Sequence, residues 1–229
     1  QADSDVNDLE LIDTKQVEKH LRTMEETVEK RIKTREELLK NNDVREKTII
    51  HTGRILHIDG DKKYSEKSNI YYKKVGLNAI VKNIPERKQP AFVGSLVRKY
   101  RPEILVITGH DGMIKKGKNF TDIYNYRNSR YFIETVKEAR KYDKQKGKKL
   151  VIFAGACQSY FEAIISAGAN FASSPARILI DFLDPLVVAE KIALTEKYKY
   201  ITIDDIAYEL RDGRDGIGGI GANGKMTKC

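Results

Sequence analysis

The chain has 229 residues, enough for one large domain or for a domain with a helical appendage, and it needs no disulfide to bury a sizeable core. Its two cysteines, Cys157 in the interior and Cys229 at the end, exclude a disulfide-rich secreted scaffold and favour a reducing compartment. The net charge of +9 permits an acidic partner, but the positive charges are spread over many predicted helix faces, which argues against nucleic acid.

Neither membrane insertion nor secretion is indicated by the sequence. No apolar run approaches the roughly 20 residues of a membrane span, and the N-terminus lacks the basic-then-apolar order of a signal peptide. We therefore expect a soluble, cytoplasmic protein. A first residue of Gln rather than Met is typical of a processed or truncated product.

Residues 1–50 form a first predicted segment. Apolar residues recur at three- and four-residue spacing from about residue 8 to 39 without Gly or Pro, which predicts a long amphipathic helix. The stripe lacks aromatics and its charges are mixed, so we expect it to pack on its own domain or on a partner helix. Whether the helix is a pro-segment, a dimer contact or a brace stays open, as does the oligomeric state. The stripe consists of Val17, Leu21, Met24, Val28 and Ile32.

The second segment, residues 51–229, alternates short apolar runs rich in β-branched residues with helical patterns. This alternation predicts an α/β domain with a mainly parallel sheet, and each helix is long enough for a crossover. We expect strands at residues 55–58, 78–81, 104–108, 150–154, 170–172 and 178–180. We expect helices at residues 62–75, 91–100, 129–142, 160–166 and 185–194.

The end of this segment is rich in glycine, with six glycines in residues 212–224. Gly-rich stretches can cradle a phosphate, but this one follows a short acidic helical pattern rather than a strand. Neither a Gly-Lys-Ser/Thr sequence nor a helix comes after it. We therefore predict a flexible or extended tail.

Two predicted strands end in reactive side chains. The strand at 104–108 is followed by Gly109 and His110, and the strand at 150–154 by Gly155, Ala156 and Cys157. The carboxyl ends of parallel strands meet at one edge of a sheet, so we expect His110 and Cys157 on the same edge. The small residues before Cys157 leave room for an acyl group beside the sulfur.

A catalytic cysteine needs a histidine or another positive field, because an ordinary thiol, with a pKa of about 8.5, is mostly protonated at neutral pH. All four histidines precede Cys157, which excludes papain-like and glutamine-amidotransferase-like arrangements. His20 belongs to the predicted amphipathic helix, His51 has no strand-end context, and His57 lies inside a strand as a satisfied core or surface histidine. His110 is the partner that the pattern favours.

The order of these features resembles the caspase-like clan of cysteine peptidases. In both, an apolar strand ends in His and Gly, a crossover helix follows, and the next strand ends in Ala-Cys, here 47 residues after His110. Within that clan the chain is similar to the YabG family of sporulation-specific proteases from about residue 53 to the tail. Four strings carry this similarity: Leu56-His57-Ile58-Asp59-Gly60-Asp61, Thr108-Gly109-His110-Asp111-Gly112, Gly155-Ala156-Cys157-Gln158-Ser159 and Asn170-Phe171-Ala172-Ser173-Ser174-Pro175.

The resemblance implies a three-layer caspase-like α/β fold, here preceded by a long helix. It implies a cysteine endopeptidase in which the Cys157 thiolate attacks the peptide carbonyl and His110 transfers the protons. Implied substrates are spore coat, cortex and related sporulation proteins, cleaved after arginine, and the protease itself. The implied location is the mother cell of a sporulating bacterium, with association with the spore coat. No metal or organic cofactor is expected, since no paired Cys/His spacing indicates a zinc site.

The chain departs from the clan in the residue after the histidine. Most members place Gly there, where its N–H helps to form the oxyanion hole, whereas Asp111 precedes Gly112 here. The resemblance therefore implies that the Asp111 or the Gly112 N–H acts with the Cys157 N–H.

Binding of an arginine side chain requires a carboxylate that offsets its desolvation. Relatives that prefer basic residues often carry an acid two residues before the cysteine, but Gly155 stands there. Asp59 and Asp61 are the first choice, because they follow the first sheet strand in a loop that lines the pocket in relatives.

Three further residues are weaker candidates for the same pocket. Asp184 precedes Pro185 at a predicted helix start, where an acid also serves as an N-cap. Ser173 and Ser174 follow the strand after Cys157, where relatives line the pocket, although ordinary turn chemistry explains them equally well.

Three alternative interpretations stay open. The chain could be another Cys-dependent hydrolase or acyltransferase on a flavodoxin-like sheet. It could be a non-catalytic module whose basic surface binds nucleic acid or an acidic coat protein. Finally, Cys157 could be a small buried hydrophobic residue, and Cys229 an inert tail thiol.

Overall fold

The computed structural model describes residues 50–115, 119–146 and 149–228, and residues 19, 22, 23, 26, 29, 30, 33 and 37. The chain divides into two compact units, Gln1–Lys47 and Thr48–Cys229. The described residues of the first unit are helical and exposed, whereas the predicted apolar stripe, His20 and Cys229 lie outside the described residues. Within the described part of the chain, no helix is long and apolar enough to span a membrane.

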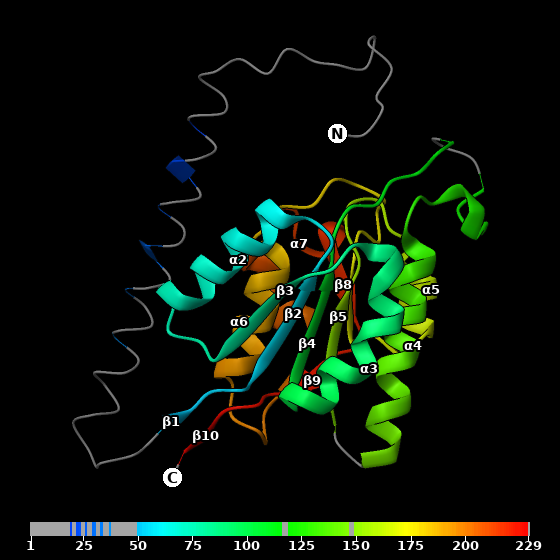
Figure 1. Ribbon diagram of the computed structural model, residues 1–229. Helices are drawn as coiled ribbons and strands as arrows, with labels where there is room; N and C mark the ends of the chain where they lie inside the picture. Colours follow the sequence, from blue (N-terminus) through cyan, green and yellow to red (C-terminus); the bar gives the residue numbers. More distant parts are fainter. Residues whose placement is uncertain are drawn as a thin grey trace. The chain divides into compact units, whose positions relative to one another are not determined.

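A six-stranded sheet forms the centre of the second unit (Figure 1). Five strands are parallel and the edge strand β8 is antiparallel, so the predicted mainly parallel sheet is confirmed. The order across the sheet is β3 (Ala79–Asn83), β2 (Ile55–Asp59), β4 (Ile104–Thr108), β5 (Val151–Ala154), β6 (Phe171–Ser173) and β8 (Ile217–Gly219).

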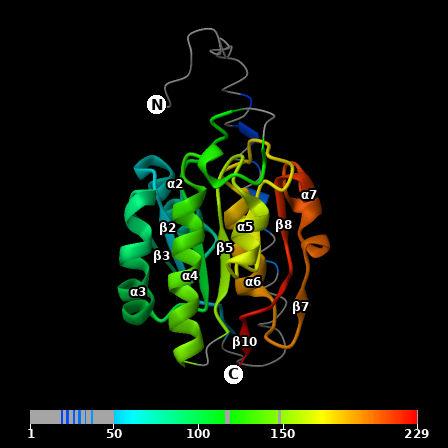
Figure 2. The same cartoon turned by 90° about the vertical axis from the view of Figure 1, so that its right-hand side faces the viewer.

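Helices cover both faces of this sheet and complete the expected three layers (Figure 2). On one face α3 (Gln89–Tyr100), α4 (Ser129–Lys146) and α5 (Phe161–Ser166) pack in a row, and on the other lie α2 (Lys62–Lys74) and α6 (Asp184–Leu194). The short α7 (Gly213–Gly216) precedes β8, and 3-10 helices lie in the described part of the chain at Glu86–Lys88, Ile123–Asn125, Ile203–Asp205 and Ala207–Glu209. Two-stranded ladders join β1 (Ile50–His51) to β10 (Thr227–Lys228) and β7 (Tyr200–Ile201) to β9 (Ala222–Asn223).

Side chains along β2 alternate between the two faces of the sheet. Leu56 and Ile58 belong to the apolar core that the sheet forms with α3 and α4. His57 and Asp59 point to the opposite face, where both are buried beneath α2. A strand that is buried on both faces therefore places two polar side chains under one helix layer.

The predicted strand at residues 178–180 is wrong. Left-handed backbone at Ser174 (φ 62°) and Arg177 (φ 58°) turns the chain away from the sheet after β6. The backbone carbonyl of Ile178 then accepts hydrogen bonds from Gln158 and Ser174. This segment crosses the carboxyl edge of the sheet instead of extending it.

The place beside β6 is taken by β8, from the Gly-rich end that was predicted to be a flexible or extended tail. β8 pairs with β6 in antiparallel register, Phe171 opposite Gly219. A Cβ atom on Gly219 would lie 2.3 Å from the Asn170 carbonyl oxygen, and one on Gly218 would lie 2.7 Å from the Phe161 ring. Glycine is required here because the backbone and the ring approach closely. Of the two predicted alternatives, the extended one is confirmed for residues 217–219.

Candidate active site

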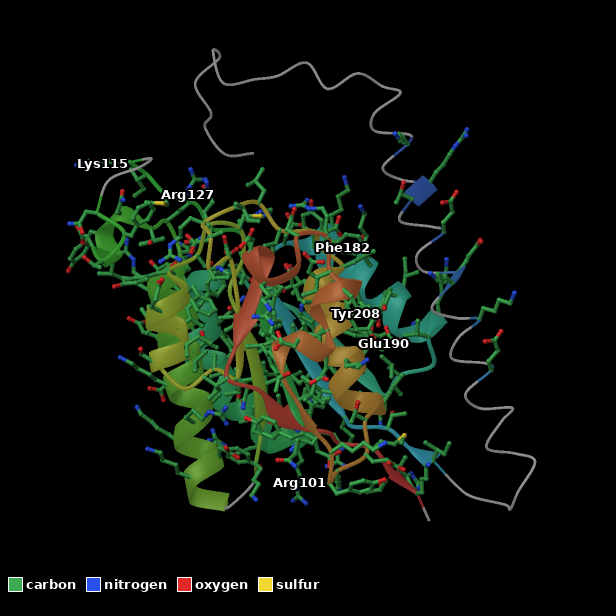
Figure 3. The ribbon with its side chains drawn as sticks, turned by 180° about the vertical axis from the view of Figure 1, so that it is seen from behind. Arg101, Lys115, Arg127, Phe182, Glu190 and Tyr208 are labelled. Atoms are coloured by element: carbon green, nitrogen blue, oxygen red, sulfur yellow. The ribbon has the colours of Figure 1, made fainter. Side chains whose placement is uncertain are left out.

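A pocket lies at the carboxyl edge of the sheet, where β2, β4 and β5 end and α2 and α6 begin. His110 and Cys157 both line it, as their strand-end positions predicted. Figure 3 shows Phe182, which also lines the pocket, at this edge and Arg101 at the opposite edge. The complete lining is His57, Asp59, Tyr64, Ser68, Thr108, Gly109, His110, Gly155, Ala156, Cys157, Ile180, Phe182 and Pro185.

Two carboxylates hold His110, one at its ring and one at its backbone. The imidazole Nε2 lies 2.8 Å from Asp61 Oδ2, and the backbone N–H donates to Glu86 Oε1 across 2.7 Å. A Cβ atom on Gly109 would lie 2.3 Å from Glu86 Oε1, so any larger residue there would displace the Glu86 carboxylate. The Tyr64 ring meets the imidazole edge-on at 5.9 Å between centroids. These contacts fix the orientation of the His110 imidazole, while more than half of the His110 side chain stays exposed.

Asp61 is the N-cap of α2. Its Oδ1 accepts the Tyr64 N–H across 3.0 Å, which leaves Oδ2 for His110. Partial burial alone would raise the pKa of Asp61, but the hydrogen bonds from His110 and from the Tyr64 and Lys63 N–H groups lower it below its ordinary value. Asp61 is therefore a carboxylate at neutral pH.

Cys157 is half-buried at the turn that follows β5. Gly155 enters this turn with a φ of 115°, and a Cβ there would lie 3.2 Å from the Cβ of Ser173. The thiol lies 3.9 Å from the Ile180 carbonyl oxygen. Burial raises the pKa of the thiol, although that carbonyl contact and the charge of Arg211 oppose the increase. The free protein therefore holds a neutral thiol, which needs a base before it can attack.

Asp111 joins the histidine loop to the cysteine loop. Its carboxylate accepts the Ser159 hydroxyl across 3.0 Å, and Ser159 Oγ in turn accepts the Ala156 N–H across 2.9 Å. The same carboxylate accepts the Gly112 N–H across 2.9 Å. Burial raises the pKa of Asp111, while its hydrogen bonds act in the opposite direction. The Gly112 N–H, one of the two predicted oxyanion donors, therefore already has an acceptor.

A buried polar chain ends in Asp59 at the floor of the pocket. Asp59 Oδ2 accepts the Thr108 hydroxyl across 2.6 Å, and His57 Nε2 lies 2.6 Å from that same hydroxyl. Asp59 Oδ1 accepts the Asp61 N–H across 2.7 Å. Burial raises the pKa of Asp59 and lowers that of His57 to about 3, so His57 is neutral. No described Lys or Arg forms an ion pair with Asp59.

The other predicted pocket residues lie elsewhere. Asp184 is the first residue of α6, where its carboxylate accepts the Asp181 and Arg211 N–H groups, and burial raises its pKa to about 6. Ser173 packs behind Gly155, and Ser174 Oγ donates to the Ile178 carbonyl. These three side chains are buried, but none lines the pocket.

Sequence reasoning missed Glu86 and the aromatic wall of Tyr64 and Phe182. Tyr64 and Phe182 contact each other with ring centroids 5.9 Å apart, and Lys67 Nζ lies over both rings. The sequence indicated a structural role only for Asp61. This residue directly precedes a predicted helix and so occupies an N-cap position. Among the described residues, no group of three or more His, Cys, Asp or Glu side chains could hold a metal ion.

Comparisons with known proteins agree with the resemblance. A family model described as YabG peptidase U57 matches residues 1–229. The chain is 44% identical over 174 residues to the sporulation-specific protease YabG of Bacillus subtilis (strain 168), covering 76% of this chain and 60% of that protein. Among solved structures, the receiver domain of the histidine kinase CKI1 from Arabidopsis thaliana, complexed with Mg²⁺, matches at a TM-score of 0.37 and 14% identity, over 61% of this chain and 90% of that one.

Proposed function

The chain belongs to the YabG peptidase family, and on this premise we propose that it is a cysteine endopeptidase with Cys157 as nucleophile and His110 as general base and acid. The single observation that carries the proposal is the pocket that Cys157 and His110 share, with the Asp59 carboxylate at its floor. The relative spans more sequence than this chain, which covers 60% of its length.

The proposed reaction proceeds through an acyl-enzyme. His110 takes the thiol proton, and the Cys157 sulfur attacks the peptide carbonyl carbon. The oxyanion that forms accepts hydrogen bonds from the Cys157 and Asp111 N–H groups. As the C–N bond breaks, His110 returns the proton to the departing amine. His110 next takes a proton from a water molecule, whose oxygen attacks the thioester carbon. As the C–S bond breaks, His110 returns that proton to the Cys157 sulfur, which releases the acid and restores the thiol.

We further propose that the residue before the cleaved bond is arginine, bound by Asp59. A buried carboxylate without a cationic partner is unfavourable, and a guanidinium that enters the pocket would offset that charge. The walls suit the rest of the side chain, since Tyr64, Ile180 and Phe182 offer apolar surface to its methylene stem. Asp59 is favoured over Asp184, which does not line the pocket.

The specificity is tested with two peptides that differ only in arginine or its uncharged isostere citrulline. Wild-type protein should cleave the arginine peptide with a kcat/KM at least about 100-fold higher, since an unpaired buried charge costs several kcal/mol. Asp59→Asn should bring the two values within about threefold by reducing cleavage of the arginine peptide. Unchanged discrimination in Asp59→Asn would assign the acid to another residue.

We propose spore coat and related sporulation proteins as substrates, together with the chain itself, and the mother cell as the site of action. The name of the Bacillus subtilis relative, a sporulation-specific protease, supports sporulation proteins as substrates, and the family resemblance supports the spore coat and the mother cell. We also propose residues 51–229 as the peptidase domain and residues 1–50 as a helical segment that contains sites for self-cleavage, such as Arg22, Arg31 and Arg35. Mass spectrometry of the purified wild-type and Cys157→Ala chains, alone and with coat extract, should find cleavage after arginine only with the wild type. Equal fragments from both would contradict the proposal.

A further inference from the structure

Within the proposed peptidase, we infer that Asp61 is a positioning residue for His110, so that the site works as an Asp61–His110–Cys157 triad rather than a dyad. This inference rests on the proposed function and assigns Asp61 a role other than arginine binding. The juxtaposition that carries it is the 2.8 Å contact between Asp61 Oδ2 and His110 Nε2.

Asp61 is held on three sides before it meets His110. Its Oδ1 caps α2 through the Tyr64 N–H, its backbone N–H donates to Asp59 Oδ1, and its carbonyl accepts the Ser65 hydroxyl across 2.8 Å. A side chain fixed in this way has little rotational freedom left. Its second oxygen is therefore aimed at the imidazole before any substrate binds.

The contact also decides which nitrogen of His110 carries the proton. A carboxylate can only accept, so Nε2 must donate its hydrogen to Asp61, and Nδ1 keeps a free lone pair. This lone pair can accept the proton of a neutral thiol. Such an acceptor is needed because burial raises the pKa of Cys157 and leaves the proton on sulfur. Once His110 has taken the proton, the negative charge of Asp61 stabilises the imidazolium.

The contacts of the Asp61 carboxylate disfavour Asp61 as the arginine-binding acid. Both carboxylate oxygens already have donors, and Asp61 is absent from the lining of the pocket, where Asp59 is present. Asp59 and Asp61 lie two residues apart in the sequence but have different roles. Asp59 ends β2 with its side chain under α2, and Asp61 is the N-cap of that helix.

Three substitutions separate positioning from helix capping. Asn and Ser both cap helices well, whereas Ala does not. Asp61→Asn can cap α2 with its oxygen, but it then presents an NH₂ donor to Nε2 and favours the wrong tautomer. Asp61→Ser can cap α2 but does not reach His110. We expect Asn and Ser to keep the melting temperature of wild type, and Ala to lower it.

The kinetic readout is cleavage of the arginine and citrulline peptides, with kcat and KM measured separately for each variant. Asp61→Asn and Asp61→Ser should lower kcat by about 10²- to 10⁴-fold for both peptides, with KM changed by less than about threefold. Unchanged kcat in both variants would reduce Asp61 to a helix cap. A loss confined to KM for the arginine peptide would instead make Asp61 a substrate-binding residue.

Parallel measurements on Cys157→Ala and His110→Ala keep the inference separate from the proposed function. If both of these variants are inactive while Asp61→Asn keeps wild-type kcat, the triad is wrong and the peptidase assignment stands. If Cys157→Ala or His110→Ala cleaves at the wild-type rate, the peptidase assignment itself is wrong.

Discussion

Thr108 donates its hydroxyl proton to Asp59 across 2.6 Å, and this contact fixes the direction of the hydrogen bonds beneath the pocket. Since the hydroxyl has only one proton, it must accept from His57 Nε2–H, and His57 Nδ1 must accept from the Tyr72 hydroxyl at 3.3 Å. His57, Thr108 and Tyr72 are neutral, and Asp59 is the carboxyl group at the end of this hydrogen-bonded series. The series therefore orients the Asp59 carboxyl group at the floor of the pocket from behind.

Replacing Thr108 by Val should weaken the selectivity for arginine. Without the hydroxyl, the pKa of Asp59 rises further above its ordinary value, because the Thr108 hydrogen bond lowers it. As pH decreases, the kcat/KM for the arginine peptide should then begin to fall at a higher pH in the variant than in wild type. The kcat/KM for the citrulline peptide should show no such change. The unsatisfied His57 N–H should also lower the free energy of unfolding by about 1 to 3 kcal/mol. Thr108→Ser is the matched control and should resemble wild type; a Val variant with the same pH profile would exclude this role.

Asp184 should make the protein less stable as pH rises. Its pKa is about 6 in the folded protein and 3.8 ordinarily, so the folded state keeps a proton that the unfolded state releases. From about pH 4 to pH 6 the free energy of unfolding should fall by about 3 kcal/mol through this one group. Asp184→Asn should lack this part of the pH dependence. Urea unfolding of both proteins between pH 3.5 and 8 measures the difference, and a wild type that gains stability relative to the variant over this range would contradict it.

Glu86 should affect catalysis through the backbone of His110. Glu86→Gln retains an oxygen that can accept the His110 N–H, and its kcat should stay within about threefold of wild type. Glu86→Ala removes the acceptor and should lower kcat by about 10-fold with little change in KM, in line with the loss of one hydrogen bond. Steady-state kinetics on the arginine peptide compares the two. Equal kcat values for Gln and Ala would show that this contact does not position the histidine.

The Gly-rich end should prove part of the folded core. Gly219→Ala places a methyl group where the Asn170 carbonyl oxygen lies 2.3 Å away, and should lower the free energy of unfolding by about 1 to 3 kcal/mol. Gly94→Ala, inside α3 with Arg98 no closer than 3.5 Å, is the control and should stabilise by up to about 1 kcal/mol. Denaturant unfolding followed by circular dichroism measures both. A Gly219→Ala protein as stable as wild type would mean that β8 contributes little.

Much of this architecture could be predicted from the sequence, because β-branched runs and helical periodicity report local burial directly. The predicted strand ends alone placed His110 and Cys157 at one edge of the sheet. The same logic failed for residues 178–180, since an apolar run also suits a segment that crosses a pocket. It left the Gly-rich end open between a flexible and an extended tail, because composition does not distinguish a glycine needed for flexibility from one needed for close approach.

The different roles of Asp59 and Asp61 could be predicted from the sequence only in part. Asp59 and Asp61 share one motif, yet their functions depend on where each side chain points after β2 ends. Asp59 continues the alternation of the strand and is buried under α2, whereas Asp61 has left the strand and caps the helix. Glu86 gave no signal at all, since its partner is a backbone N–H 24 residues away.

We propose Cys157 as the nucleophile of an arginine-directed peptidase. The most direct test of this proposal is to incubate the full chain with an arginine peptide chloromethyl ketone and to map the adduct by mass spectrometry. Cys229 serves as an internal control thiol. We expect one adduct per chain on Cys157, loss of peptidase activity in step with labelling, and little labelling by the citrulline analogue. Equal labelling of Cys157 and Cys229, or full activity after Cys157 is alkylated, would contradict the account.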